Sequence, residues 1–214
     1  MKYEETWSSL KRHRLPEWLD DAKFGIYFHW GPYSVPAFGN EWYPNNMYLL
    51  GDMYKHHCET YGEPDEFGYK DFIPKFTAEH FNPDEWAKLF KEAGAKFAGP
   101  VAEHHDGFSM WDSRVNKWNA KNMGPKRDIV GEMEKAIRKQ GMKFITTFHH
   151  ANNWYYYYHM EGLDTSDPEY AGLYGKPHPA TNNVGTSGII NDRPDKEFCE
   201  IWLKIGRASC RERV

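Results

Sequence analysis

The sequence is poor in cysteine, and its few cysteines form no recognisable pattern. Among its 214 residues are only Cys58, Cys199 and Cys210. Their spacing offers neither a Cys-x-x-Cys pair nor a disulfide framework. We therefore expect free thiols and no structural zinc site.

The sequence also lacks a basic excess, a long apolar run and a glycine-rich phosphate loop. Its net charge is −4 with interspersed signs, which disfavours partners such as nucleic acid or anionic lipid. No apolar run approaches the roughly 20 residues of a membrane span, and the amino terminus has no apolar signal core. No GxGxxG or GxxxxGK[ST] loop supports nucleotide binding. We expect a cytoplasmic chain as written, or a periplasmic or secreted one if a leader was lost.

Aromatic residues are abundant instead. They make up 17% of the chain and include nine tryptophans and fourteen tyrosines. Such an excess is typical of a ligand cleft lined with rings, and equally of a large buried core. Composition does not choose between the two.

Predicted strands and helices alternate along the chain. The three predicted strands are residues 24–28, 96–103 and 143–148. Asn82 begins one predicted helix, which Gly94 ends just before the second strand. Asp128 begins another, which Gly141 ends just before the third strand. Between the first strand and the first of these helices, we expect a short helix within residues 43–62 and a long loop over residues 63–75.

This alternation predicts βα units in a parallel sheet. An open doubly wound sheet and a (β/α)8 barrel both fit the pattern, and the missing nucleotide loop favours the barrel. A complete barrel takes about 250 residues and eight strands. We therefore predict an α/β fold that is a partial (β/α)8 TIM-like barrel, holding the N-terminal βα units only.

The end of the chain differs from the rest. A helix is predicted from Pro194, with an apolar face of Phe198, Ile201 and Trp202. The last residues, 205–214, show no apolar period and resemble the translation of a common short-read sequencing adapter. We therefore predict that residues 1–204 are the N-terminal part of the barrel domain and that 205–214 are a non-native tail without function.

Each predicted strand ends in histidine. His29 follows the first strand, His104 and His105 the second, and His149 and His150 the third. Strand alternation would send adjacent side chains to opposite faces, but the Asp-Gly turn after His105 lets both rings reach the rim of a barrel. The alternative is that one of this pair is an interior hydrogen-bonding residue.

Glu41 and Trp42 follow the first strand after a Gly/Pro-rich turn. A carboxylate beside an indole supplies hydrogen bonds for hydroxyls and a flat apolar face for a pyranose. Together with the histidines, they predict a sugar-binding corner. The histidines also raise a metal site, but the first strand carries His-Trp rather than the His-x-His of barrel metal hydrolases, so we predict no metal.

Other polar and aromatic residues are expected to have supporting or surface positions. Asn152, Asn153 and Trp154 are expected to add amide and indole contacts, and the tyrosines of 155–158 to pack a loop. The histidines without a supporting pattern are expected on the surface: His56, His57, His80, His159 and His178.

Several motifs match one family when they are taken together. They are Phe-Gly-Ile-Tyr-Phe-His-Trp-Gly-Pro-Tyr-Ser-Val-Pro-Ala at 24–37, Asn-Glu-Trp-Tyr at 40–43, Phe-x-Ala-Glu-x-Phe at 76–81, Asp-x-Trp-Ala-x-Leu-x-Lys-x-Ala-Gly-Ala at 84–95, and His-His-Asp-Gly-Phe-x-x-Trp-Asp-Ser at 104–113. From about Trp7 to Leu203 the chain resembles the α-L-fucosidases of glycoside hydrolase family 29. The resemblance implies a barrel-like catalytic domain that hydrolyses terminal α-L-fucose with retention, through two carboxylates and without metal or cofactor. Its partner would be a fucosylated glycan or glycoside.

The resemblance also implies site residues. His29, Glu41, Trp42, His104 and His105 would surround the fucose. A sixth residue, His149, stands where many relatives carry a tyrosine at the end of the third strand, so its sugar contact departs from the common pattern.

The catalytic carboxylates of the family are expected beyond Leu203. The nucleophilic aspartate would end a later strand and the acid/base would follow it, while Asp106 and Asp112 belong to the His-His-Asp-Gly-Phe motif and are not substitutes. Without a nucleophile the covalent step is lost, so the chain is expected to be inactive. The alternatives are a non-catalytic sugar-binding module and a metal-dependent barrel hydrolase. The sequence leaves the oligomeric state open.

Overall fold

The computed structural model describes residues 3–4, 6–178 and 193–213, with side chains up to residue 208. A parallel sheet forms its centre. The strands are β1 (Gly25–Phe28), β2 (Phe97–Glu103), β3 (Lys143–Phe144) and β4 (Thr147–Phe148). β2 pairs with β1 on one side and with β3 and then β4 on the other, always in parallel. The predicted α/β class is confirmed, and β3 and β4 together form the predicted third strand.

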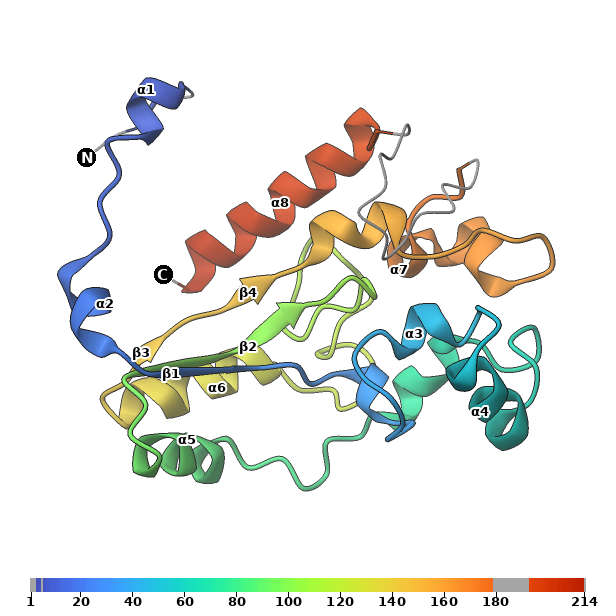
Figure 1. The fold of residues 1–214 in the computed structure, drawn as a ribbon, viewed down its shortest axis with the longest axis horizontal. Coiled ribbons are helices and arrows are strands. Elements are labelled where there is room, and N and C mark those ends of the chain that lie inside the picture. Colours follow the sequence, from blue (N-terminus) through green and yellow to red (C-terminus); the bar gives the residue numbers. More distant parts are fainter. Residues whose placement is uncertain (1–2, 5, 179–192, 214) are drawn as a thin grey trace.

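Two helices cover one face of the sheet. They are α5 (Pro83–Glu92) and α6 (Ile129–Lys139), which lie side by side below the strands in Figure 1. The Asn82 side chain accepts hydrogen bonds from the first turn of α5, and the Asp128 side chain accepts one from Gly131 N at 3.0 Å. Trp86 packs edge-on against Phe28 of β1. Both predicted helix starts are confirmed.

The segment between β1 and α5 contains more helical structure than its composition predicts. It contains η1 (Pro32–Ser34), α3 (Tyr43–Asn46), α4 (Asp52–Tyr61) and η2 (Tyr69–Lys75). The expected long loop over residues 63–75 is therefore wrong in its second half. Phe72 and Ile73 are buried there, and their burial outweighs the loop-forming glycines and prolines nearby.

His57 is also placed differently from the prediction. Its side chain is 0% exposed, lies 3.2 Å from Tyr43 Oη and donates to Phe67 O at 2.8 Å. A buried imidazole needs such partners, because an unsatisfied polar group is costly away from water. The surface assignment of His57 is wrong.

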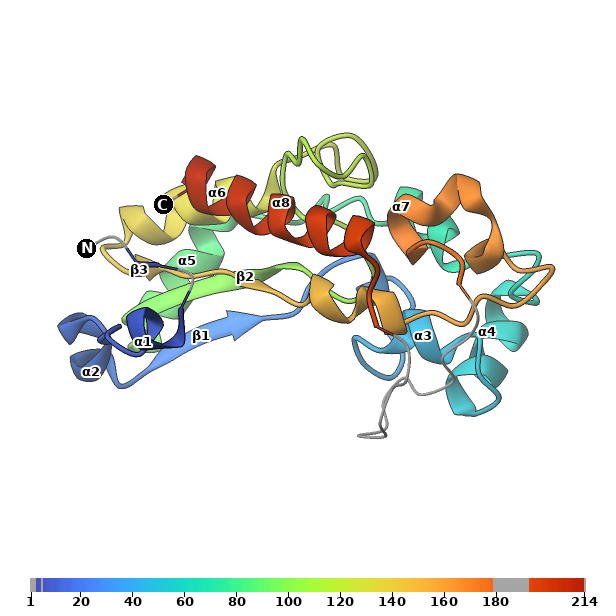
Figure 2. The ribbon, with the colours of Figure 1, turned by 90° about the horizontal axis from the view of Figure 1, so that it is seen from above.

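Several short helices extend the fold beyond both ends of the strands. α1 (Trp7–Leu10) and α2 (Glu17–Ala22) precede β1, while η3 (His150–Tyr155), η4 (Asp164–Ser166), η5 (Pro168–Tyr170) and α7 (Ala171–Tyr174) follow β4. Figures 1 and 2 show α3, α4 and α7 beyond the carboxyl ends of the strands, with α1 and α2 at the opposite end. Across the described ranges, no helix combines the length and apolar character needed to cross a bilayer.

The last helix, α8 (Lys196–Arg213), runs back toward the amino ends of the strands (Figure 2). Phe198 and Ile205, seven residues apart and therefore on one helix face, are both buried, whereas Trp202 is exposed. The apolar stripe thus extends past Lys204, and the expected face that includes Trp202 is wrong. The non-native origin of residues 205–214 stays a prediction.

The free-thiol prediction is confirmed for Cys58 and Cys199. The side chain of Cys210 lies outside the described residues.

Candidate functional site

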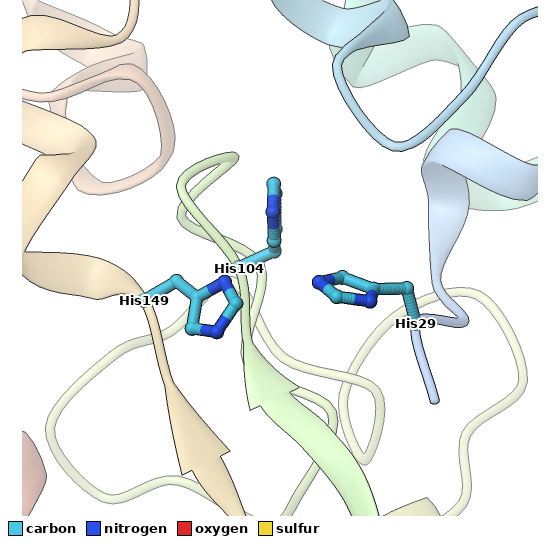
Figure 3. Close-up of side chains that lie close together, drawn as sticks. All are labelled: His29, His104 and His149. Carbon is cyan, nitrogen blue, oxygen red and sulfur yellow. The ribbon is translucent and has the colours of Figure 1, made fainter. Parts of the chain in front are cut away.

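Three histidines from three strand ends converge beyond the sheet. His29 follows β1, His104 follows β2 and His149 follows β4. One ring nitrogen of each lies within 4.8 Å of the others, and the ring centroids are 5.1 to 5.3 Å apart. Figure 3 shows the three side chains pointing toward one another from separate segments. Parallel pairing causes the convergence: the ladder continues to the histidines, with His149 N donating to Glu103 O at 2.8 Å.

A tight turn brings a fourth ring to the same place. The His105 ring centroid lies 4.2 Å from that of His104 and 5.2 Å from that of His149. Gly107 allows this turn, because its φ is +80° and a Cβ there would lie 2.0 Å from Leu173 O. Both members of the pair therefore reach the rim, as the Asp-Gly signal predicts.

One hydrogen bond fixes the tautomer of His105. Its Nδ1 lies 2.7 Å from the carbonyl oxygen of His149. A carbonyl oxygen only accepts, so Nδ1 carries the proton and, in the neutral ring, Nε2 keeps a lone pair. Asn153 supports the same residue by donating from Nδ2 to His105 O at 2.8 Å. The amide contact expected of Asn153 is thus made with the protein backbone.

Trp42 and Glu41 form a wall beside the rings. The Trp42 ring lies 5.3 Å from His105 and 5.2 Å from Tyr156 between centroids. Tyr156 Oη donates to Glu41 O at 3.2 Å. The Glu41 charge acts on both His105 and His149, opposing the decrease in their pKa values. All six residues predicted for the sugar corner thus lie in one neighbourhood; their binding roles stay predictions.

Two tyrosines next to the histidines were not predicted from the sequence to belong to the site. The buried rings of Tyr33 and Tyr156 lie 5.5 Å and 6.1 Å from the His104 ring. Tyr156 belongs to the run expected to pack a loop, and nothing in four consecutive tyrosines marks which one meets the rim. For Tyr33, the only sequence signal of a place at the site is its position within the 24–37 motif.

Burial favours the neutral state of His104, His105 and His149. Burial lowers the pKa of His104 to about 2, and the charges of His105, His29 and His149 act in the same direction. Burial also lowers the pKa of His105 to about 4 and that of His149 below its usual value. A neutral imidazole offers one N–H donor and one lone pair, so it can serve hydroxyl groups or a metal ion.

His104 has binding capacity that the protein itself does not use. Its side chain is buried, and Nδ1 has no hydrogen-bond partner within the described ranges. A buried polar atom without a partner is costly. A ligand or a water molecule that reaches Nδ1 would satisfy it.

Asp106 stabilises the turn. Its carboxylate accepts hydrogen bonds from Tyr69 Oη at 2.6 Å and from Phe108 N at 3.3 Å, and burial raises its pKa to about 7. Asp112, from the same motif, is exposed. That neither residue replaces a catalytic carboxylate stays a prediction.

His150 does not join the other strand-end histidines. Its Nδ1 contacts the carboxylate of Glu103, which is 0% exposed and also accepts from Ser109 Oγ. The His150 ring stacks on Phe198 of α8 at an interplanar angle of 9°. The expected indole contact of Trp154 is likewise absent from the histidine cluster as described, because its ring packs against Phe198 and His178.

A family model described as Alpha-L-fucosidase matches residues 1–204 of the chain. Among curated relatives, the chain is 43% identical over 157 residues to the tissue alpha-L-fucosidase of Rattus norvegicus, an alignment covering 72% of this chain and 33% of that protein. The chain spans about a third of the length of the curated relatives it matches.

Solved structures show the same likeness. The chain is similar to the alpha-fucosidase of Thermotoga maritima, with a TM-score of 0.74 and 34% identity over 97% of this chain and 46% of that one. A structure of that enzyme in complex with fucose aligns with a TM-score of 0.65 and 42% identity, covering 69% of this chain and 37% of that one.

Proposed function

The chain belongs to the α-L-fucosidase family, and from that membership we propose that the rim of His29, His104, His105 and His149 binds a terminal α-L-fucose unit. The observation that carries the proposal is the gathering of four imidazoles from three strand ends in one place. A related enzyme has been solved with fucose bound, which supports this choice of sugar.

The chemistry of the rim suits a deoxy sugar. The neutral ring of His104 offers a donor and an acceptor to vicinal hydroxyls, and that of His105, whose N–H is donated to His149 O, offers the Nε2 lone pair as an acceptor. Trp42 lies beside them with a flat apolar surface for the ring or the methyl edge of fucose. The Glu41 carboxylate accepts from a further hydroxyl.

The proposed family reaction is retaining hydrolysis by double displacement, which needs two carboxyl groups about 5–5.5 Å apart. Of the carboxylates that lie near the rim among the described residues, Asp106 and Glu103 are buried and engaged with Tyr69 and Ser109. Glu41 alone does not supply a pair. We therefore place the nucleophile and the acid/base beyond Leu203 in a longer chain, and we expect this chain to bind sugar without turnover. The proposed reaction uses no metal and no cofactor.

Calorimetric titration tests the binding. We expect heat on addition of L-fucose, none with D-glucose, and loss of the L-fucose signal in His104→Ala. His80→Ala is the matched control, because His80 is an exposed histidine away from the rim. A folded chain that gives no heat with L-fucose would refute the proposal.

Turnover is tested separately with a chromogenic aryl α-L-fucoside. We expect no release of the phenol above the rate without protein. Release that His104→Ala abolishes would contradict the placement of both catalytic carboxylates beyond Leu203.

A further inference from the structure

Nitrogen atoms of three of the four rim histidines are close enough together to suit a ligand of a different kind. We infer that His29, His104 and His149 form a binding site for divalent transition-metal ions of the imidazole-preferring class, such as Zn²⁺, and that the metal excludes the sugar from the rim. One nitrogen of each ring lies within 4.8 Å of the other two. The inference uses the same rim as the proposed function but does not require that fucose binds there.

The spacing is near that of a zinc site with three histidines. Tetrahedral Zn–N bonds of about 2.1 Å place the ligand nitrogens roughly 3.4 Å apart, so the ring nitrogens must approach one another by up to about 1.4 Å. His29 and His149 are only half-buried, which leaves their side chains room to rotate. His104 is 3% exposed and fixed between them.

The ligand capacity of these rings is not consumed by the protein. His104 Nδ1 is buried and has no hydrogen-bond partner within the described ranges. His105, by contrast, uses its Nδ1 proton on His149 O, which holds the backbone of one ligand residue in place. The site thus consists of three metal ligands, one of which is held in place by His105.

Three protein ligands leave the fourth position of a tetrahedral zinc ion open for water. An ion there would lie among the three side chains, which Figure 3 shows close together. A sugar hydroxyl and the metal would therefore compete for the same nitrogens.

The test is a titration of the chain, stripped with a chelator and then freed of it, with ZnCl₂ in a non-coordinating buffer. We expect a single saturable site by calorimetry. We also expect the visible absorption of tetrahedral Co²⁺ when cobalt replaces zinc. Both signals should be lost in His29→Ala and in His149→Tyr and retained in His80→Ala. Circular dichroism of each variant separates loss of a ligand from loss of the fold.

The outcomes separate the two proposals. Because the titration contains no sugar, zinc binding that depends on His29 and His149 stands even if fucose fails to bind. Absence of saturable binding, or binding that persists in both variants, would overturn the metal site. If fucose binds by itself, saturating L-fucose should weaken zinc binding, and unchanged zinc affinity would overturn the competition.

Discussion

At the scale of single residues, adjacent groups at one turn have pKa values shifted in opposite directions. Burial lowers the pKa of His105 to about 4 and raises that of Asp106 to about 7. Between these values the folded chain keeps His105 unprotonated and Asp106 protonated, while the unfolded chain does the reverse over most of that range. The two residues therefore oppose each other in the pH dependence of stability.

The sign of each contribution follows from proton linkage. Between about pH 4 and 6.5 the unfolded state binds a proton at His105 that the folded state does not, so His105 makes the free energy of unfolding rise with pH. From about pH 4 to 7 the folded state holds a proton at Asp106 that the unfolded state has lost. Asp106 therefore makes the free energy of unfolding fall as the pH rises.

Denaturant unfolding across pH 4.5–6.5 checks this. We expect His105→Gln to make the slope of unfolding free energy against pH less positive than in the unsubstituted chain. Asp106→Asn should make it more positive. Equal slopes in all three proteins would show that neither group titrates as its burial implies.

Gly107 provides a second test at this scale. Its φ is +80° and a Cβ would meet Leu173 O, whereas Gly94 has a φ of +93° and open space around it. Gly107→Ala should therefore combine backbone strain with a clash and cost roughly 1–3 kcal/mol or more, and displace His105. Gly94→Ala, which adds only strain, is the matched control. Equal destabilisation in thermal unfolding would contradict the close approach.

At the scale of elements, the helix caps could be predicted from sequence because they are local. Asn82 accepts hydrogen bonds from Asp84 N at 3.2 Å and Glu85 N at 3.3 Å, as the Asn-Pro-Asp-Glu pattern indicates. Local hydrogen bonds of this kind depend on a few consecutive residues. The same is true of the Asp128 cap.

Replacement of the α5 cap should have a modest and separable effect. We expect Asn82→Ala to lower the free energy of unfolding by about 1 kcal/mol, because two N–H groups of the first turn lose their acceptor. Asn82→Asp keeps an acceptor and should retain most of the stability. If the two variants unfold at the same denaturant concentration, the side-chain cap contributes nothing.

Elements that depend on distant contacts could not be predicted. η2 is held by contacts outside it, because the buried Phe72 packs edge-on against Tyr43 and the buried Tyr69 donates to Asp106. His57 is buried through Tyr43 and Phe67. No pattern of neighbouring residues predicts these contacts, and the glycines and prolines nearby indicate a loop instead.

At the scale of the whole molecule, the sheet is open on both sides. β1 and β3 each pair only with β2 within the part of the chain that the structure describes. The sequence predicted this partial barrel from its three βα steps, and it predicted the convergence of the histidines because parallel strands end at one edge. The pairing of Glu103 with His150 beneath the rim could not be predicted from the sequence.

An open sheet edge is a template for association. Tyr27 of β1 is 55% exposed, so we expect the sedimentation coefficient of the chain to rise with concentration and Tyr27→Lys to reduce that rise. Leu50→Lys, which changes an apolar residue of 91% exposure outside the sheet, should leave the rise unchanged. A monomer at all concentrations would show that the β1 edge is protected.

The central claim is that imidazoles from three parallel strands form one sugar-binding rim. Its most direct test is a nitrogen–proton correlation spectrum of the histidine rings, recorded on ¹⁵N-histidine-labelled chain during addition of L-fucose. Fucose binding at the rim should give saturable shifts of the ring nitrogens of His29, His104, His105 and His149, with His80 unmoved. Ring signals that stay fixed in a folded chain, or that move only at His80, would contradict it.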